Sequence, residues 1–137
     1  MSVSVNPPLI VVSIAHRARM CQFLSKTMRY GVSFLGEKGK KYSNHFAGRP
    51  DDTLEIPWIH QERMPLIADA LGHFIARVVN AHEAGDHTLF IGEVEYLDYT
   101  DGRPLLYYAG GYNQLKADPK PQNHERYDDE MFFFQSG

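Results

Sequence analysis

The sequence is poor in cysteine and in long hydrophobic runs. Cys21 is the only cysteine, so an intrachain disulfide is excluded, and we interpret it as a small buried side chain and not as a catalytic thiol. The longest apolar run, residues 9–15, is too short to span a bilayer, and no signal-peptide pattern precedes it. We therefore expect a cytoplasmic protein with no membrane partner.

A strong charge of either sign is also missing. The 137 residues carry a formal net charge of -3, and no basic stripe with interleaved aromatic residues occurs. This balance argues against nucleic acid as a partner. The contents of hydrophobic residues (43%) and charged residues (23%) are ordinary for a single globular domain of this length.

The motifs of several common enzyme classes do not occur in the sequence. It contains no glycine-rich phosphate loop of the Rossmann or Walker type and no Gly-x-Ser-x-Gly elbow. Potential metal ligands are densest in residues 82–87 (HEAGDH), but their spacing is not the helical His-Glu-x-x-His pattern. We interpret this segment as a polar hairpin turn and predict no metal site.

The first half of the chain changes its hydrophobic period several times. Residues 9–15 form a β-branched run after Pro7 and Pro8, which predicts a strand buried on both faces. Residues 18–28 repeat apolar side chains at three- and four-residue steps, which predicts a helix. A strand over 30–35 and a second helix over 40–46, stopped by Gly48, are expected next.

The pattern of the second half predicts loops and strands. Residues 49–65 are rich in proline and aspartate and predict a loop with a brief extended piece at 54–59, where Trp58 is a packing residue. Strands are expected over 73–81, 88–99 and 105–109, joined by turns at 83–86 and 100–104, the latter with an Asp-Gly hairpin signal. The fold class is therefore mainly β, a small and partly open β-barrel with short helices.

Composition divides the chain into a domain over 1–115 and a C-terminal extension over 116–137. The extension contains a linker-like stretch at 119–123 and the apolar cluster Met131-Phe132-Phe133-Phe134. Because exposed aromatic clusters are sticky, we expect this cluster to dock on its own domain or on a partner subunit.

Five segments, in one consistent order, resemble the flavin reductase components of two-component flavin monooxygenases, the group serving phenol and 4-hydroxyphenylacetate hydroxylases. The segments are SVSVNPPLIVVSI (2–14), SNHFAG (43–48), PLIADAL (65–71), DHTLFIGEV (86–94) and PLLYYAGGYNQL (104–115). The resemblance implies an FMN-binding split barrel that dimerises and holds FMN or FAD between its subunits. It also implies an NAD(P)H:flavin oxidoreductase that supplies reduced flavin to a partner monooxygenase.

The resemblance carries over to individual positions. His87 matches a histidine near the nicotinamide, where it would act as the catalytic residue. Arg17 and Arg19 would bind phosphate, because guanidinium groups bind it in a charge-assisted way. The positions implied in cofactor binding are Ser2, Val3, Ser4, Ser13, Ile14, Ala15, His16, Arg17, Ala18, Arg19, Phe46, Ala47, Gly48 and Tyr112.

The chain departs from the family at its start. Family members ordinarily have a helix and two strands before the position of Ser2, so we expect an N-terminally shortened barrel that lacks part of the flavin clamp. Two alternatives to reductase activity follow from this departure. One is a flavin-binding split barrel without reductase activity, and the other is a non-catalytic oligomeric scaffold.

Overall fold

The computed structural model of the protein describes residues 1–115, so the predicted extension over 116–137 and its aromatic cluster lie outside the described residues. No helix in the described part of the chain is long and apolar enough to cross a membrane. In chain order the elements are β1 (Ser2–Ser4), β2 (Leu9–Ala15), α1 (Arg19–Thr27), β3 (Arg29–Phe34), the 3-10 helix η1 (Glu37–Gly39), α2 (Lys40–Phe46), β4 (Trp58–Gln61), β5 (Met64–Ile67), β6 (Gly72–Ala84), β7 (His87–Tyr99), β8 (Leu106–Tyr108) and β9 (Gly111–Asn113).

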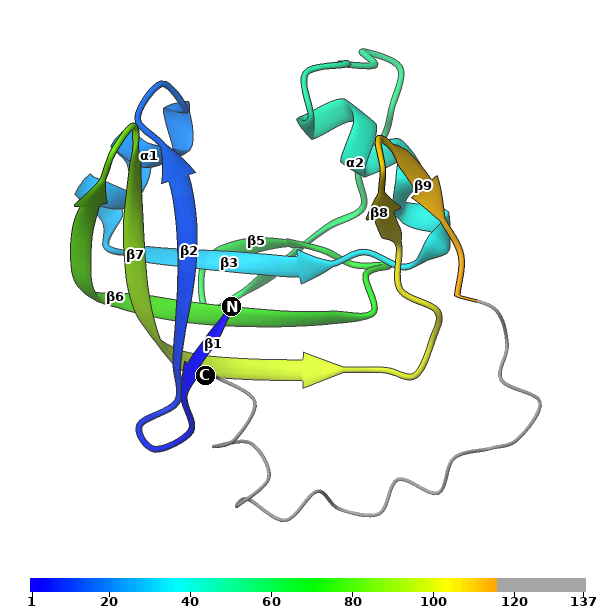
Figure 1. Cartoon of the computed structure of the whole chain (residues 1–137). Helices are drawn as coiled ribbons and strands as arrows, with labels where there is room; N and C mark the ends of the chain where they lie inside the picture. The colour runs from blue at the N-terminus through cyan, green and yellow to red at the C-terminus, as the bar shows by residue number, and fades with distance from the viewer. Residues whose placement is uncertain (116–137) are drawn as a thin grey trace.

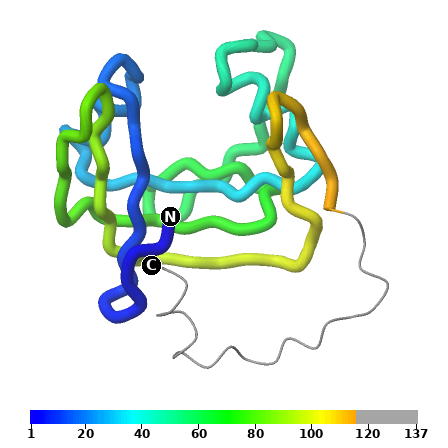
Figure 2. The backbone as a smooth tube through the Cα atoms, in the orientation of Figure 1, coloured from blue at the N-terminus to red at the C-terminus, as the bar shows by residue number. Residues whose placement is uncertain are grey.

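Five antiparallel strands form the main sheet, in the order β1-β2-β7-β6-β3. β6 and β7 form a long hairpin of 13 residues each, and its tip lies beside the loop that follows β2 (Figures 1 and 2). The β4–β5 and β8–β9 hairpins are separate small sheets. The arrangement confirms the prediction of a mainly β fold with two short helices.

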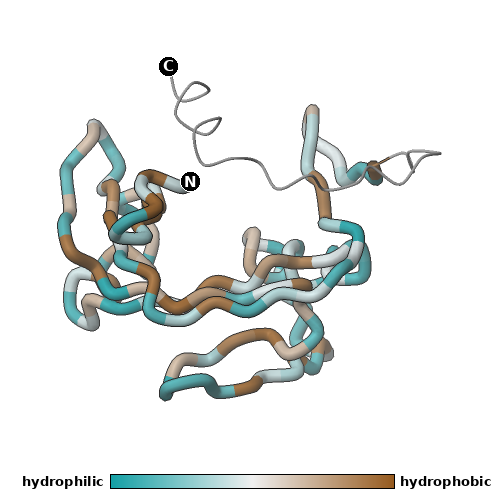
Figure 3. Tube along the Cα trace, turned by 90° about the horizontal axis from the view of Figure 1, so that it is seen from below, coloured by the Kyte–Doolittle hydropathy of each residue, from teal (hydrophilic) through white to brown (hydrophobic). Residues whose placement is uncertain are grey.

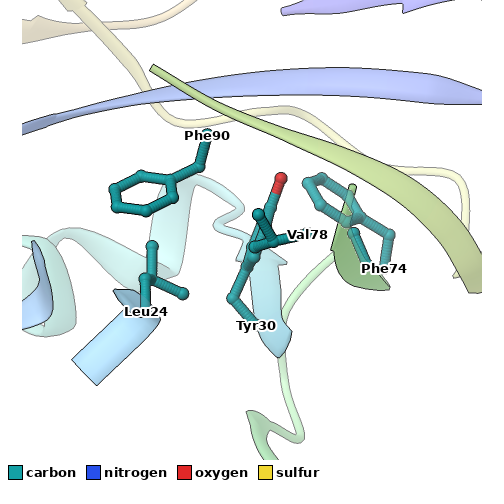
Figure 4. Close-up of a cluster of buried hydrophobic side chains, with 6 residues drawn as sticks. Leu24, Tyr30, Phe74, Val78 and Phe90 are labelled. Carbon is teal, nitrogen blue, oxygen red and sulfur yellow. The ribbon is translucent and has the colours of Figure 1, made fainter. Parts of the chain in front are cut away.

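The core lies where α1 packs against the curved sheet. Hydrophobic and hydrophilic residues change repeatedly along the strands (Figure 3), as expected for strands with one buried face. The buried cluster joins Leu24 of α1 to Tyr30, Phe74, Val78 and Phe90 of the sheet (Figure 4). The docking of α1 on the sheet therefore depends on a few fully buried side chains.

Most predicted elements are present, with boundaries within a few residues. β2 and α2 have the predicted bounds, and α1 and β3 differ from prediction by one residue at each end. Burial of β2 on both faces is wrong, because its residues are half-buried and Ser13 is exposed. One side of this apolar run is therefore covered only in part by the described chain.

Two hairpins in the structure differ from the predictions. The segment read as a loop with an extended piece at 54–59 contains β4 paired with β5, with Pro65 opposite His60. The strand predicted at 105–109 is short and pairs with β9, so the Asp-Gly hairpin back to β7 is wrong. After β7 the chain instead contacts the β3–η1 connection, where the Leu105 N–H donates to the Leu35 carbonyl.

A buried histidine connects three strands at the end of the sheet. His73 of β6 is only 5% exposed, and its Nδ1 lies 2.8 Å from Asp98 Oδ1 of β7. Its Nε2 lies 2.7 Å from the carbonyl oxygen of Ile67 on β5. The Tyr96 hydroxyl donates to the other oxygen of Asp98, at 2.7 Å. Hydrogen bonds from Tyr96 and then from His73 lower the pKa of Asp98 below its usual value.

Acid should weaken this connection. A carboxyl group whose pKa is lowered by folding contributes stability above its unfolded pKa, about 4, and loses it as the pH falls through the folded value. We expect Asp98→Asn to lower the free energy of unfolding at pH 7 and to have little effect near pH 2. Urea titrations of both proteins at the two pH values test this. An equal loss at both would show that the carboxylate charge is unimportant.

Candidate functional site

A large apolar groove lies between α1 and α2. In Figure 1 the two helices stand apart on the same side of the sheet, with β3 running between them. The groove has a volume of about 880 Å³, which is typical of sites that bind cofactors or other small molecules. It is lined by Val12 and Ile14 of β2, Met20, Phe23, Leu24 and Thr27 of α1, Arg29, Tyr30, Gly31, Val32 and Ser33 of β3, Leu35, Ser43, Phe46, Ala47, Trp58, Met64, Pro65 and Ile67.

Large hydrophobic side chains on both walls of the groove are exposed. Phe23 on α1 is 55% exposed, Phe46 on α2 is 59% exposed and Trp58 on β4 is 47% exposed. The rings of Phe46 and Trp58 pack edge to face with their centroids 6.2 Å apart. Exposed aromatic side chains gathered in one concavity are typical of a ligand-binding or interaction site.

A second, polar group of residues lies where β2 ends. Its members do not line the groove: His16, Arg17, Arg19, Asp86 and His87. Ala15 of β2 is paired with His87, the first residue of β7, and the His16 N–H donates to the Asp86 carbonyl at 2.9 Å. His87 Nδ1 lies 2.6 Å from Asp86 Oδ1. The hydrogen bond from His87, followed by the His87 charge, lowers the pKa of Asp86, and the His16 charge adds a smaller effect.

Arg17 directly follows His16, Arg19 is two residues further along the chain, and both are exposed. Ala18, in extended conformation, precedes the first turn of α1, which begins at Arg19. The predicted segment over 13–19 therefore combines the end of β2, one short loop and the start of α1. The backbone contact of His16 with Asp86 brings this segment next to the β6–β7 turn, which His87 follows.

The second predicted group lies at the end of α2. Phe46 and Ala47 line the groove, and Gly48, with a φ of 87°, ends the helix in the left-handed conformation that favours glycine. The Tyr112 hydroxyl lies 2.9 Å from Ser43 Oγ and 3.1 Å from Asn44 Oδ1 of α2. This contact packs the β8–β9 hairpin against α2, next to the groove.

The structure does not bring every predicted residue together. Ser2, Val3 and Ser4 form β1, which pairs with Leu9 and Ile10 at the start of β2. His87 pairs with Ala15 at the other end of that strand, and the six residue steps between Leu9 and Ala15 correspond to about 20 Å. Within one chain, β1 and His87 therefore lie at opposite ends of β2.

Sequence reasoning missed three prominent groove residues. Met20 and Phe23 fit the apolar repeat of α1, and only the fold shows that they face the groove and not the core. Trp58, predicted to be a packing residue, packs against Phe46 but is half-exposed on the groove wall. Within residues 1–115 no group of three or more histidine, cysteine, aspartate or glutamate side chains is arranged to hold a metal ion.

Comparison with known proteins gives a consistent result. Residues 1–116 match the family described as flavin reductase like domain. An NADH-dependent flavin reductase of a Rhodococcus species is 42% identical over 115 residues, which cover 84% of this chain and 65% of the relative. This chain therefore spans somewhat less than two thirds of the length of that relative.

Solved structures resemble the fold closely. The flavin reductase PheA2 superposes with a TM-score of 0.82 at 40% identity, covering 85% of this chain and 76% of PheA2. The styrene monooxygenase flavin reductase of Pseudomonas putida S12 superposes with a TM-score of 0.79 at 33% identity, covering 86% of this chain and 77% of that protein.

Proposed function

We propose, because this chain belongs to the flavin reductase like domain family, that it is an oxidoreductase that uses NADH to reduce FMN or FAD. The observation that carries the proposal is the groove between α1 and α2. Its two walls contain Ile14 from one predicted flavin-binding group and Phe46 and Ala47 from the other, although these groups are far apart in the sequence.

The residues around the groove fit a flavin. The groove is lined mainly by apolar and aromatic side chains, which suit a planar aromatic ring system. Arg17 and Arg19 lie at the start of α1, the helix whose Met20 and Phe23 line the groove, and would bind the flavin phosphate through charge-assisted hydrogen bonds. When bound, the two cofactors supply the redox chemistry themselves, so the protein needs no nucleophile of its own.

The side chains around the proposed site would bind and orient the cofactors. Met20 and Phe23 on one wall and Phe46 on the other exclude water from the bound ring. His87, half-buried at the start of β7, would orient the nicotinamide and stabilise negative charge that develops during hydride transfer. Tyr112 holds the β8–β9 hairpin against α2 and so supports the wall that contains Phe46.

We further propose that two copies form the complete site. Ser2–Ser4 and His87 lie at opposite ends of β2, so a single chain does not place both next to one flavin. A second copy in an antiparallel orientation would place β1 of one chain near His87 of the other. Such a homodimer would form an isologous interface, which is the commonest kind in homo-oligomers.

The reduced flavin would serve a separate monooxygenase. This part of the proposal is supported by the similar reductase from Pseudomonas putida S12, which is described as the flavin reductase of styrene monooxygenase. Phe23, Phe46 and Trp58 on the groove walls are exposed in the described chain, which suits a flavin that enters and leaves as a diffusing substrate.

Anaerobic mixing of the purified protein with NADH and FMN or FAD tests the activity. We expect the nicotinamide absorbance to fall much faster than in a protein-free blank. One flavin should be bleached for each NADH that is oxidised. Tight binding of flavin without NADH oxidation would replace the proposal with a flavin-binding role. Absence of both flavin binding and NADH oxidation would leave only the role of a non-catalytic oligomeric scaffold.

A further inference from the structure

We propose that Asp86 is a positioning residue that fixes the orientation and the protonation of the His87 imidazole in the candidate site. The inference rests on the proposed function for its catalytic consequence, but the contact itself does not. His87 Nδ1 and Asp86 Oδ1 lie 2.6 Å apart, the distance of a short, charge-assisted hydrogen bond.

The hairpin geometry makes this contact possible. Gly85, with a φ of 64°, takes the left-handed conformation that the tight β6–β7 turn requires, and Asp86 follows as the last residue before β7. The Asp86 carbonyl accepts a hydrogen bond from the His16 N–H. One residue therefore contacts the histidine through its side chain and the loop after β2 through its backbone.

The chemistry of the pair follows from the carboxylate. An ionised carboxylate only accepts hydrogen bonds, so Nδ1 of His87 must carry the hydrogen and Nε2 is the nitrogen left for a ligand. Hydrogen bonding to His87 lowers the pKa of Asp86, which keeps its carboxylate ionised at neutral pH.

Other charged groups near the pair must be taken into account. His16, from the loop after β2, acts on Asp86 through its charge. Arg17 and Arg19 follow it in the chain, and Glu83, on β6 of the same hairpin, pairs with Thr88. Glu83 makes no hydrogen bond to His87 within residues 1–115, which makes Glu83→Gln a matched control for the loss of one carboxylate.

Imidazole NMR of the full chain without cofactors tests the contact directly. We expect the neutral His87 ring of the wild type to be protonated at Nδ1 and this preference to be lost in Asp86→Ala. In Asp86→Asn, whose amide can donate as well as accept, the Nδ1 preference should be weaker, whereas Glu83→Gln should leave it unchanged. A His87 ring with the same tautomer in Asp86→Ala as in the wild type would overturn the proposal.

The kinetic consequence is a lower turnover with unchanged flavin binding. General acid–base side chains contribute about 10²-fold or more, so partial loss of the correct His87 tautomer in Asp86→Asn should lower kcat with NADH about tenfold. Flavin affinity should not change, because the Asp86 carbonyl still contacts His16. An unchanged kcat in Asp86→Asn would overturn the catalytic part. Absence of NADH oxidation by the wild type would instead refute the proposed function, and the NMR result would still decide the contact.

Discussion

Replacement of His87 by alanine is expected to slow NADH-dependent flavin reduction by about 10²-fold, the lower range for removal of a group that assists proton or charge transfer. His87 starts β7 beside Ala15, and its Nδ1 contacts Asp86. The groove residues that would contact the flavin ring lie on α1 and α2, so flavin affinity should change little. Stopped-flow measurement of flavin bleaching, with separate flavin titrations, gives both quantities.

His82→Ala is the matched control for this variant. His82 lies in the same hairpin, on β6, and is exposed opposite Leu89. It should retain wild-type reduction rates. If His87→Ala weakens flavin binding and leaves the rate of hydride transfer intact, the role assigned to His87 is wrong.

Phe90→Ala should have the largest effect on stability, a loss of about 3–5 kcal/mol in the free energy of unfolding. Phe90 is 1% exposed and shares the core cluster with Leu24 of α1. Truncation leaves a cavity under α1, and marginally stable domains tolerate few such losses. Urea denaturation followed by circular dichroism measures the effect.

Phe23→Ala provides the comparison with the same chemical change. Phe23 is 55% exposed on the groove wall, so its truncation should cost much less than that of Phe90. A loss below about 1 kcal/mol for Phe90→Ala would contradict the assigned core, since such values are typical of exposed positions. Phe23→Ala should instead weaken flavin binding. The two variants therefore distinguish the contribution of α1 to stability from its contribution to flavin binding in the groove.

The sequence predicted regular elements well where a single period dominates. β2, α1 and α2 were recognised from β-branched runs and helical repeats, which are local signals. The β4–β5 hairpin was missed because Pro65 lies within a strand and because its turn places Glu62 and Arg63, and not glycine or asparagine, at positive φ. Neither feature is a usual sequence signal for a hairpin.

The Asp101-Gly102 signal predicted a hairpin that does not form. Gly102 instead lies close against Leu71, where a Cβ would come within 2.4 Å of the Leu71 Cδ2 atom. The glycine therefore allows the Leu71 side chain to pack closely here and does not form a two-residue turn, and a larger residue would have to displace the Leu71 methyl group. The β8–β9 turn uses Ala109 and Gly110, both at positive φ.

The candidate site could be predicted only in part. The segments over 13–19 and 46–48 and the residues His87 and Tyr112 came from resemblance, and their functional roles stay predictions. The groove itself could not be foreseen, since it depends on the packing of α1, α2 and the β4–β5 hairpin around β3. Periodicity shows that Met20 and Phe23 share a helix face with Leu24, but not that only Leu24 is fully buried.

Trp58 gives the groove an optical property of practical use. It is the only tryptophan in the 137 residues, and it stands half-exposed against Phe46 on the groove wall. The indole emission of the whole protein therefore originates from a single place. Any compound that enters between the two helices should alter the wavelength or intensity of this emission, so affinities can be measured on the unlabelled protein.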